Sequence, residues 1–233
     1  MTTVCIHQPD FAPWIGFFDR LVRSDIYVVL DNVQFLRRGW HHRDKIKTAN
    51  GPRWLTVPVR KKGKFDQRID QAEIDNSTNW PREHLNTLRA NYARAPFFKN
   101  HIGEIEEIYG SSWTSLADLN MALVHLFMKM FGIGTQIRTA SSLRPKGRSN
   151  ELLVDILRTV GARRYLAGEG SRAYLDETLF NTHGIDVEWQ SFRHPVYPQL
   201  HGDFVPGLSS FDFLLNCGSR ECAQILRGQG SAQ

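Results

Sequence analysis

The sequence predicts an α/β fold in which a mainly parallel, Rossmann-like sheet is joined by a helical lobe. Short apolar runs at residues 4–6 and 26–30 each stop at polar residues, and the segment between them has helical spacing. A strand, a helix and a second strand in this order almost always form a right-handed unit with parallel strands. Three consecutive helical segments over residues 80–132 predict the lobe.

The first strand-helix-strand unit indicates where a ligand would bind. Pro13 fits the first helical position, and one helix face would carry Trp14, Phe17, Phe18 and Leu21, leaving Asp19, Arg20 and Arg23 off that face. Ligands in parallel sheets bind beyond the carboxyl ends of the strands. We therefore expect the polar residues that end the two strands to share one crevice. These residues are His7, Gln8, Asp31 and Asn32.

The remaining elements follow from the same periodicities. We expect a loop with irregular turns over residues 35–50, strands over 53–59 and 68–74, and helices that end near 92, 110 and 131. Strands are then expected at 135–140, 165–167 and 185–189, with helices between them. Residues 1–233 are expected to form one domain, with 80–132 as the helical lobe and 190–218 as a C-terminal wrap over a site or the core.

Composition excludes several classes of protein. No apolar run approaches the roughly 18 residues of a membrane span, and the start lacks the pattern of a secretory signal. Three scattered cysteines favour neither a disulfide framework nor a zinc site. We therefore expect a cytoplasmic protein with no transmembrane segment and no structural metal. The sequence identifies no cofactor.

The net charge of +5 arises partly from a basic segment between residues 37 and 64. A positive lip suits a phosphate-bearing ligand such as a nucleotide, a nucleotide-sugar or an anionic membrane surface. The plain alternative for residues 60–64 is a solvated basic loop. Because the excess is modest, we prefer a small phosphate-bearing ligand over nucleic acid.

Imidazoles and neighbouring donors supply the candidate site. His7 is the first candidate for a general base because imidazole titrates near neutral pH, and Asp31 is expected to orient the acceptor. His194 is a further acid–base candidate if it faces the crevice, and the alternative is that it fixes the C-terminal wrap by bonding to backbone. The expected substrate-binding residues are Gln8, Trp14, Asn32, Gln34, Arg37, Trp40 and His201.

Two loops are candidates for binding an anion. Ser149 fits the N-cap of a helix and follows Lys146 and Arg148, so backbone N–H groups, helix dipole and side-chain charge would converge on a phosphate. The alternative for Ser149 is simple capping. A second loop, Gly168-Glu-Gly-Ser171, would let a ligand approach the backbone closely. Neither loop matches a phosphate-loop or dinucleotide fingerprint.

A set of motifs spread over residues 4–218 resembles a known family. The motifs are His7-Gln-Pro, Pro13-Trp-Ile-Gly-Phe-Phe-Asp19, Leu30-Asp-Asn-Val-Gln-Phe35, Trp54-Leu-Thr-Val-Pro58, Tyr165-Leu-Ala-Gly168, Tyr174-Leu-Asp176 and His194-Pro-Val-Tyr-Pro-Gln-Leu-His-Gly202. Together they resemble the WbqC-like family, which is associated with bacterial O-antigen and surface-polysaccharide gene clusters. The resemblance implies tailoring of nucleotide-linked amino sugars by acyl or aminoacyl transfer, with an acyl or aminoacyl carrier as a partner.

A second resemblance concerns the nucleotidyltransferases whose first loop carries His-x-Gly-His. Here that place reads Trp14-Ile-Gly-Phe17, so the glycine is kept and both histidines are absent. The segment Lys146-Gly-Arg-Ser149 is similar to the second, mobile nucleotide-binding signature of those enzymes. This resemblance implies adenylyl transfer with an altered triphosphate site.

Three functions are therefore weighed. The first is a transferase that moves an acyl or aminoacyl group onto an amine, with His7 as base. The second is an ATP-dependent nucleotidyltransferase or amide-forming ligase, and the third is a non-catalytic module that binds a sugar nucleotide. Cys5 lies on the same strand face as His7, which would allow thioester chemistry, but a mid-strand cysteine is more often inert packing.

Overall fold

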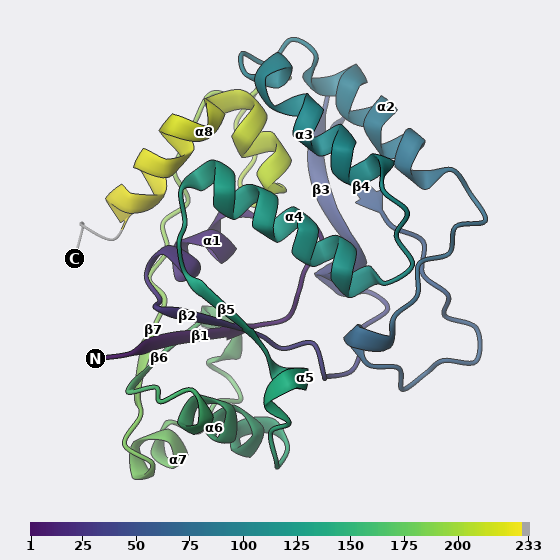
Figure 1. Ribbon diagram of the computed structural model, residues 1–233. Helices are drawn as coiled ribbons and strands as arrows, with labels where there is room; N and C mark the ends of the chain where they lie inside the picture. Colours follow the sequence, from purple (N-terminus) through teal and green to yellow (C-terminus); the bar gives the residue numbers. More distant parts are fainter. Residues whose placement is uncertain (230–233) are drawn as a thin grey trace.

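A five-stranded parallel sheet runs through the centre of the molecule (Figure 1). The computed structural model describes residues 1–229. The strands of this sheet are β1 (Thr3–His7), β2 (Ile26–Val29), β5 (Gln136–Thr139), β6 (Arg164–Ala167) and β7 (Asp186–Trp189). They lie in the order β5-β2-β1-β6-β7, and every neighbouring pair is parallel. The predicted α/β class with a parallel sheet is confirmed.

Strand β1 occupies the middle of the sheet. Val4 pairs with Ile26 of β2 on one side and with Tyr165 of β6 on the other. Counted along the chain, the strands run in the order 3-2-1-4-5, which is the order of doubly wound sheets. In such sheets the order reverses beside the first strand, and a crevice opens at its carboxyl end.

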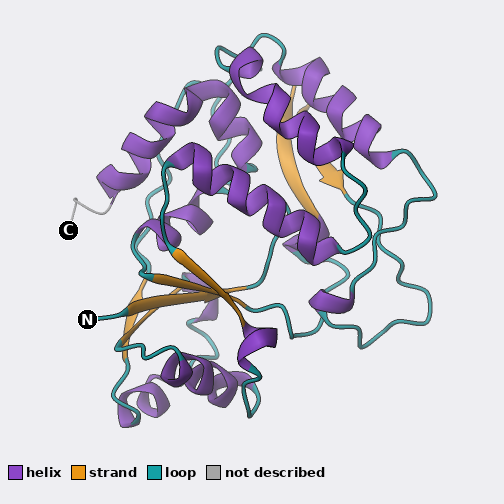
Figure 2. Cartoon of the chain, in the orientation of Figure 1, coloured by secondary structure: helices purple, strands orange, loops and turns teal. Residues whose placement is uncertain are grey.

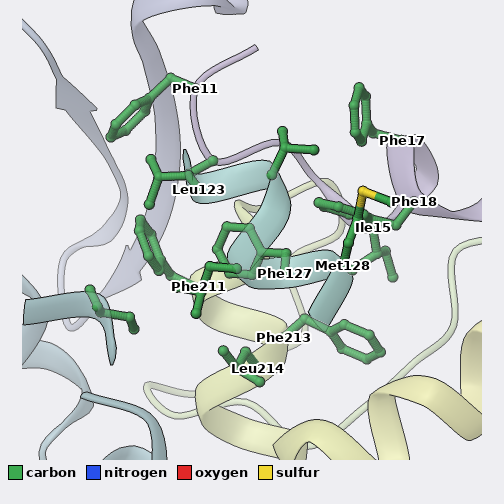
Figure 3. Close-up of a cluster of buried hydrophobic side chains, with 14 of the residues drawn as sticks. Phe11, Ile15, Phe17, Phe18, Leu123, Phe127, Met128, Phe211, Phe213 and Leu214 are labelled. Atoms are coloured by element: carbon green, nitrogen blue, oxygen red, sulfur yellow. The ribbon is translucent and has the colours of Figure 1, made fainter. Parts of the chain in front are cut away.

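Helices cover both faces of the sheet and bury two separate apolar clusters. Figure 1 shows α1 (Ile15–Val22), α4 (Leu116–Phe131) and α8 (Ser210–Gln229) above the sheet, with α6 (Ser149–Thr159) and α7 (Glu177–Thr182) below it. The upper cluster includes phenylalanines from α1, α4 and α8, as the close-up shows for Phe18, Phe127 and Phe211 (Figure 3). The lower cluster packs α6 and α7 against the other sheet face. Alternate residues of β1 thus enter different clusters, Cys5 above and Val4 and Ile6 below.

The predicted helices of the lobe are present. They are α2 (Trp80–Tyr92), α3 (Phe98–Gly110) and α4, which ends at Gly132 in the left-handed conformation. Figure 2 shows α2 and α3 beside a separate pair of strands, whereas α4 lies over the parallel sheet. None of the helices within residues 1–229 is long and apolar enough to cross a membrane.

Helix α8 was not predicted from the sequence. All residues from Phe211 to Cys217 are buried, the polar Asp212 and Asn216 included, so this part of the helix has no side that faces solvent. The helix is interrupted at Gly218, which has a positive φ of 73°. A Cβ at this position would lie 2.6 Å from the Phe97 ring, so the close approach of α3 requires glycine.

The prediction of a loop over residues 35–50 is wrong in its second half. Strand β3 (Arg43–Thr48) pairs antiparallel with β4 (Gly51–Thr56) in a two-stranded sheet. Charged residues hide β3 from pattern analysis, because Asp44 and Lys47 are buried rather than solvated. The Lys47 ammonium donates to the backbone carbonyls of Gly202 and Asp203, which compensates its burial.

The expected strand over residues 68–74 is also absent. Its place is taken by the short 3₁₀ helix η2 (Ile69–Gln71), and a single bridge joins Ile74 to Val59. The other short elements are η1 (Trp40–His42), α5 (Ala140–Leu143) and η3 (Glu169–Ser171). Helix α1 begins at Ile15, two residues after Pro13.

A buried carboxylate is one of the groups that tie the C-terminal wrap to the core. Asp212 of α8 is fully buried and accepts hydrogen bonds from the Tyr92 hydroxyl at 2.8 Å, the Tyr197 hydroxyl at 2.8 Å and the Gln199 amide at 2.9 Å. Burial raises the pKa of Asp212, and these hydrogen bonds oppose the rise. The network joins the lobe, the wrap and α8.

Removing one donor from this network is expected to destabilise the protein. Tyr197→Phe leaves the Asp212 carboxylate short of a buried partner, so the free energy of unfolding should fall by about 1–3 kcal/mol. Urea unfolding at pH 7 measures the change. Tyr174→Phe is the matched control, because Tyr174 is 64% exposed and its loss of a hydroxyl should matter by less than about 0.5 kcal/mol. Equal losses for the two variants would contradict the role of the network.

Candidate functional site

A cavity of about 550 Å³ opens at the carboxyl end of the parallel sheet. Its wall combines the ends of strands with the start of α6 and the loop after β6. Volumes of this size are typical of small-molecule sites. The polar lining residues are His7, Gln8, Trp14, Arg20, Ser149, Asn150, Glu169, Ser171, Tyr174 and Gln190. The cavity therefore lies where the strand order reverses, between β1 and β6.

His7 ends β1 and holds one defined tautomer. Its Nδ1 lies 2.9 Å from the backbone carbonyl oxygen of Gln8, which can only accept, so Nδ1 carries the proton and donates it. Nε2 is then the unprotonated nitrogen, the state required of a general base. The imidazole packs edge-on against Phe17 at a ring distance of 5.3 Å.

Burial is the main reason why the pKa of His7 is lowered to about 4, and the positive charge of Arg20 lowers it further. Asp10 opposes this effect, with its Oδ2 3.6 Å from His7 Nδ1 and its Oδ1 3.2 Å from Nδ1 of the buried His41. His7 is accordingly neutral at pH 7 and available to accept a proton.

Arg20 is the site residue that sequence reasoning missed. We predicted Asp19 and Arg20 off the buried face of α1, but both are buried, and Arg20 is only 7% exposed. Within residues 1–229 its Nε has no hydrogen-bond partner. The guanidinium lies beside Gly168, where an added Cβ would be 2.8 Å from Nη1. An arginine on a predicted polar face gives no sequence signal of such a position.

The glycine loop after β6 forms one side of the cavity, as its sequence suggested. Residues 168–171 line it through η3, and the Ser171 hydroxyl donates to the Gly168 carbonyl at 2.7 Å. A Cβ at Gly170 would meet no atom within 4 Å, so the backbone there is open to a ligand. The Glu169 carboxylate is paired with Arg172.

Of the three residues expected to bind phosphate, Lys146, Arg148 and Ser149, only Ser149 lines the cavity. Ser149 lines the cavity, but it is the first residue of α6 with a positive φ of 50°, and the N-cap is Arg148. The simple capping alternative for the Ser149 side chain therefore does not apply. Lys146 and Arg148 are not among the lining residues, and the backbone N–H of Lys146 donates to Asp155.

Asp31 lies at the end of β2 but does not line the cavity. Its carboxylate accepts hydrogen bonds from the backbone N–H and the hydroxyl of Ser141, which ties β2 to the first turn of α5. Asn32 is likewise outside the lining, and its Oδ1 is buried without a partner among the described residues. Of the two predicted strand ends, only that of β1 places its polar residues in the cavity.

The donors of the basic segment make local contacts instead. The Gln34 amide donates to the Phe65 carbonyl and Arg37 donates to that of Lys61, while Trp40 packs against Trp54. In the wrap, His201 bonds to the Asn91 carbonyl. These contacts satisfy or occupy side chains that the sequence offered as substrate ligands, and Gln34, Arg37, Trp40 and His201 lie outside the cavity wall.

His194 reaches the edge of the site through Trp14. Its ring stacks on the Trp14 indole at 6.0 Å, and its Nδ1 lies 2.9 Å from the Pro195 carbonyl. Trp14 itself is 37% exposed and covers Gly16, where a Cβ would be 2.2 Å from the indole. The wrap therefore supports the aromatic wall of the cavity. Burial lowers the pKa of His194.

Neither a thiol nor a clustered metal site is built at this cavity. Cys5 is buried in mid-strand at 1% exposure, and burial raises its pKa, so the thiolate is disfavoured. Within the described part of the chain, no group of three or more His, Cys, Asp or Glu side chains is arranged to hold a metal ion. The polar side-chain groups that line the cavity are imidazole, guanidinium, indole, amide, carboxylate and hydroxyl.

The chain is an α/β protein with a parallel sheet and a ligand-sized cavity at the switch point of that sheet. The chain belongs to the WbqC-like protein family, whose model matches residues 8–224, and the resemblance inferred from its motifs is confirmed. It is 33% identical over 229 residues to "Uncharacterized protein Rv1507c" of Mycobacterium tuberculosis (strain ATCC 25618 / H37Rv), covering 97% of this chain and 98% of that relative. No solved structure matches the chain.

The electrostatics of His7 give a measurable prediction. In the free protein the His7 imidazole should titrate with a pKa of about 4, as followed by NMR of its ring carbon and proton signals. Arg20→Met should raise this pKa because it removes a nearby positive charge, and Asp10→Asn should lower it. The stabilisation by neutral His7 is complete above the unfolded pKa of about 6.5 and is lost as pH falls towards 4. A wild-type titration near 6.5 would contradict the buried environment.

Proposed function

We propose that the protein is a transferase that moves an acyl or aminoacyl group onto the amine of a small, phosphate-bearing substrate such as a nucleotide-linked amino sugar. The observation that carries this proposal is the His7 imidazole, which is neutral, has Nδ1 bound to the Gln8 carbonyl and stands in the wall of the cavity. The chain belongs to the WbqC-like family, and the resemblance to that family implies the same reaction class.

The proposed reaction needs a base and donors, with no protein nucleophile. The substrate amine attacks the carbonyl carbon of the donor, and His7 Nε2 takes the proton that the nitrogen loses as the new C–N bond forms. The bond between the acyl group and its carrier breaks, and the carrier's leaving atom receives a proton. Gln8 is the side-chain donor nearest in sequence that also lines the cavity, and it would stabilise the developing oxyanion.

Trp14 and the start of α6 would hold the rest of the substrate. The indole offers an apolar face for a sugar or base, supported from behind by His194. Ser149 and Asn150 supply polar groups on the opposite element. This arrangement would orient the amine towards His7, which matters because positioning supplies much of the rate in transfer reactions.

An ATP-dependent nucleotidyltransferase or amide-forming ligase is the second candidate. The strand order 3-2-1-4-5 favours it, since nucleotides bind at the switch point of such sheets. Trp14 and Phe17 stand where the related loop carries histidines, so the catalytic signature of those enzymes is absent here. Release of pyrophosphate from ATP would support this candidate over acyl transfer.

Replacement of His7 tests the proposal. His7→Gln should leave binding of a nucleotide-linked amino sugar within about twofold while reducing transfer from an acyl or aminoacyl carrier by at least about 100-fold. Binding is measured by calorimetry and transfer by mass spectrometry of the product. His125→Gln is the matched control, because His125 is exposed on α4, does not line the cavity and hydrogen-bonds to the Met121 carbonyl.

Two results would point elsewhere. Transfer at the wild-type rate by His7→Gln would refute the role of His7 as base. The second result concerns the wild type, tested with carriers loaded with different acyl and aminoacyl groups. If it shows no turnover, while wild type and His7→Gln bind the nucleotide-linked amino sugar equally well, the non-catalytic binding module would be favoured.

A further inference from the structure

The cavity contains a buried positive charge with which no side chain of the described residues pairs. Arg20 is 7% exposed, lines the cavity and forms no ion pair or hydrogen bond within residues 1–229. Arg23, on the next turn of the chain, provides the contrast, because it pairs with Glu188 and lies 3.7 Å from Asp19. Burying a cation without a partner is unfavourable, so such a group indicates a missing anion.

No carboxylate of the described residues pairs with Arg20. Burial raises the pKa of the neighbouring Asp19 and the charge of Arg20 opposes this rise, but the two side chains form no ion pair. Asp19 accepts from the Gln190 amide at 2.7 Å and faces Arg23. Asp19 does not line the cavity, and Glu169, the carboxylate that does, is paired with Arg172. The neighbouring wall is instead made of neutral His7, the open backbone at Gly170 and the first residues of α6. A negative group entering the cavity therefore meets Arg20 with no competing carboxylate.

Gly168 makes the exposed edge of Arg20 accessible. A Cβ at this position would lie 2.8 Å from Nη1, so any other residue would push the guanidinium away. The backbone of Gly168 has a φ of −76°, which suits every residue type, so its lack of a side chain and not its conformation is what the site uses. The glycine loop identified in the sequence thus has a definite purpose at this cavity.

We propose that Arg20 is the anchor for the phosphate group of the ligand, and that the ligand is a nucleoside diphosphate or its sugar conjugate. The planar guanidinium fits phosphate oxygens through two parallel hydrogen bonds. A cavity of about 550 Å³ at the switch point beside β1 is where doubly wound sheets place a nucleotide diphosphate. The anchor lies on α1, away from Lys146 and Arg148.

This inference deepens the proposed function, because the phosphate would belong to the same substrate, yet binding does not require that transfer occurs. A phosphate-binding Arg20 can be distinguished from a structural arginine by the effect of its replacement on melting temperature and on ligand binding. Removing an unpaired buried charge should leave the melting temperature of the free protein unchanged or higher, while ligand binding is lost. Removing the paired Arg23 should have the opposite combination of effects.

The test uses uridine diphosphate as the probe, with calorimetry and thermal melting of the full chain. Wild type and Arg23→Met should bind it with similar affinity, and Arg20→Met should bind about 10–100-fold more weakly. The free Arg20→Met protein should melt at or above the wild-type temperature. Gly168→Ala is the second variant, should Arg20→Met fail to fold, and it should weaken binding because its methyl displaces the guanidinium.

Several outcomes would overturn the proposal. They are equal affinity of wild type and Arg20→Met for uridine diphosphate, no binding to the wild type, or tighter binding of malonate than of pyrophosphate, which would assign Arg20 to a carboxylate ligand. Arg20-dependent binding of uridine diphosphate without any transfer activity would refute the proposed transferase and leave the phosphate anchor intact.

Discussion

Strand β1 hydrogen-bonds to β2 along one edge and to β6 along the other, and the connections that lead to these two strands run over opposite faces of the sheet. The segments that leave β1 and β6 consequently diverge, and the space between them is the cavity. Because β1 is held between β2 and β6, the residues at its carboxyl end, His7 and Gln8, lie in the cavity wall. The position of the site follows from backbone pairing, and the side chains determine only its chemistry.

The proposed anion-binding residue Arg20 affects the strength of the proposed base His7. Burial and the charge of Arg20 both lower the pKa of His7, which keeps the imidazole neutral but weakens it as a base. An anion bound at Arg20 would cancel the second of these effects and raise the pKa towards the operating pH. Substrate binding and base strength would thus be linked through one guanidinium, and only a site holding the anionic substrate would have the stronger base.

Much of the fold could be predicted from periodicity, and the two longest elements that pattern analysis missed share one cause. The parallel strands and lobe helices have one apolar face or an apolar run, which pattern analysis detects. Strand β3 and helix α8 do not, because β3 buries Asp44 and Lys47 and α8 is buried on all sides near Phe211. Tertiary partners, such as the carbonyls that receive Lys47, compensate these polar groups, and a sequence does not reveal partners from distant segments.

Among the predicted site residues, some of those chosen by their position at the end of a strand or helix line the cavity, whereas those chosen from a donor-rich loop do not. His7, Gln8 and Ser149 were chosen because they follow or precede regular elements, and they line the cavity. Residues chosen because a loop was rich in donors, such as Arg37 and Trp40, are occupied by local partners. Arg20 lies within a helix and not in a donor-rich loop, so neither criterion selects it. Its proposed role rests on its lack of a hydrogen-bonding partner. A lone buried charge is visible only once all its neighbours are placed, so structure adds most where a site is defined by an unsatisfied group.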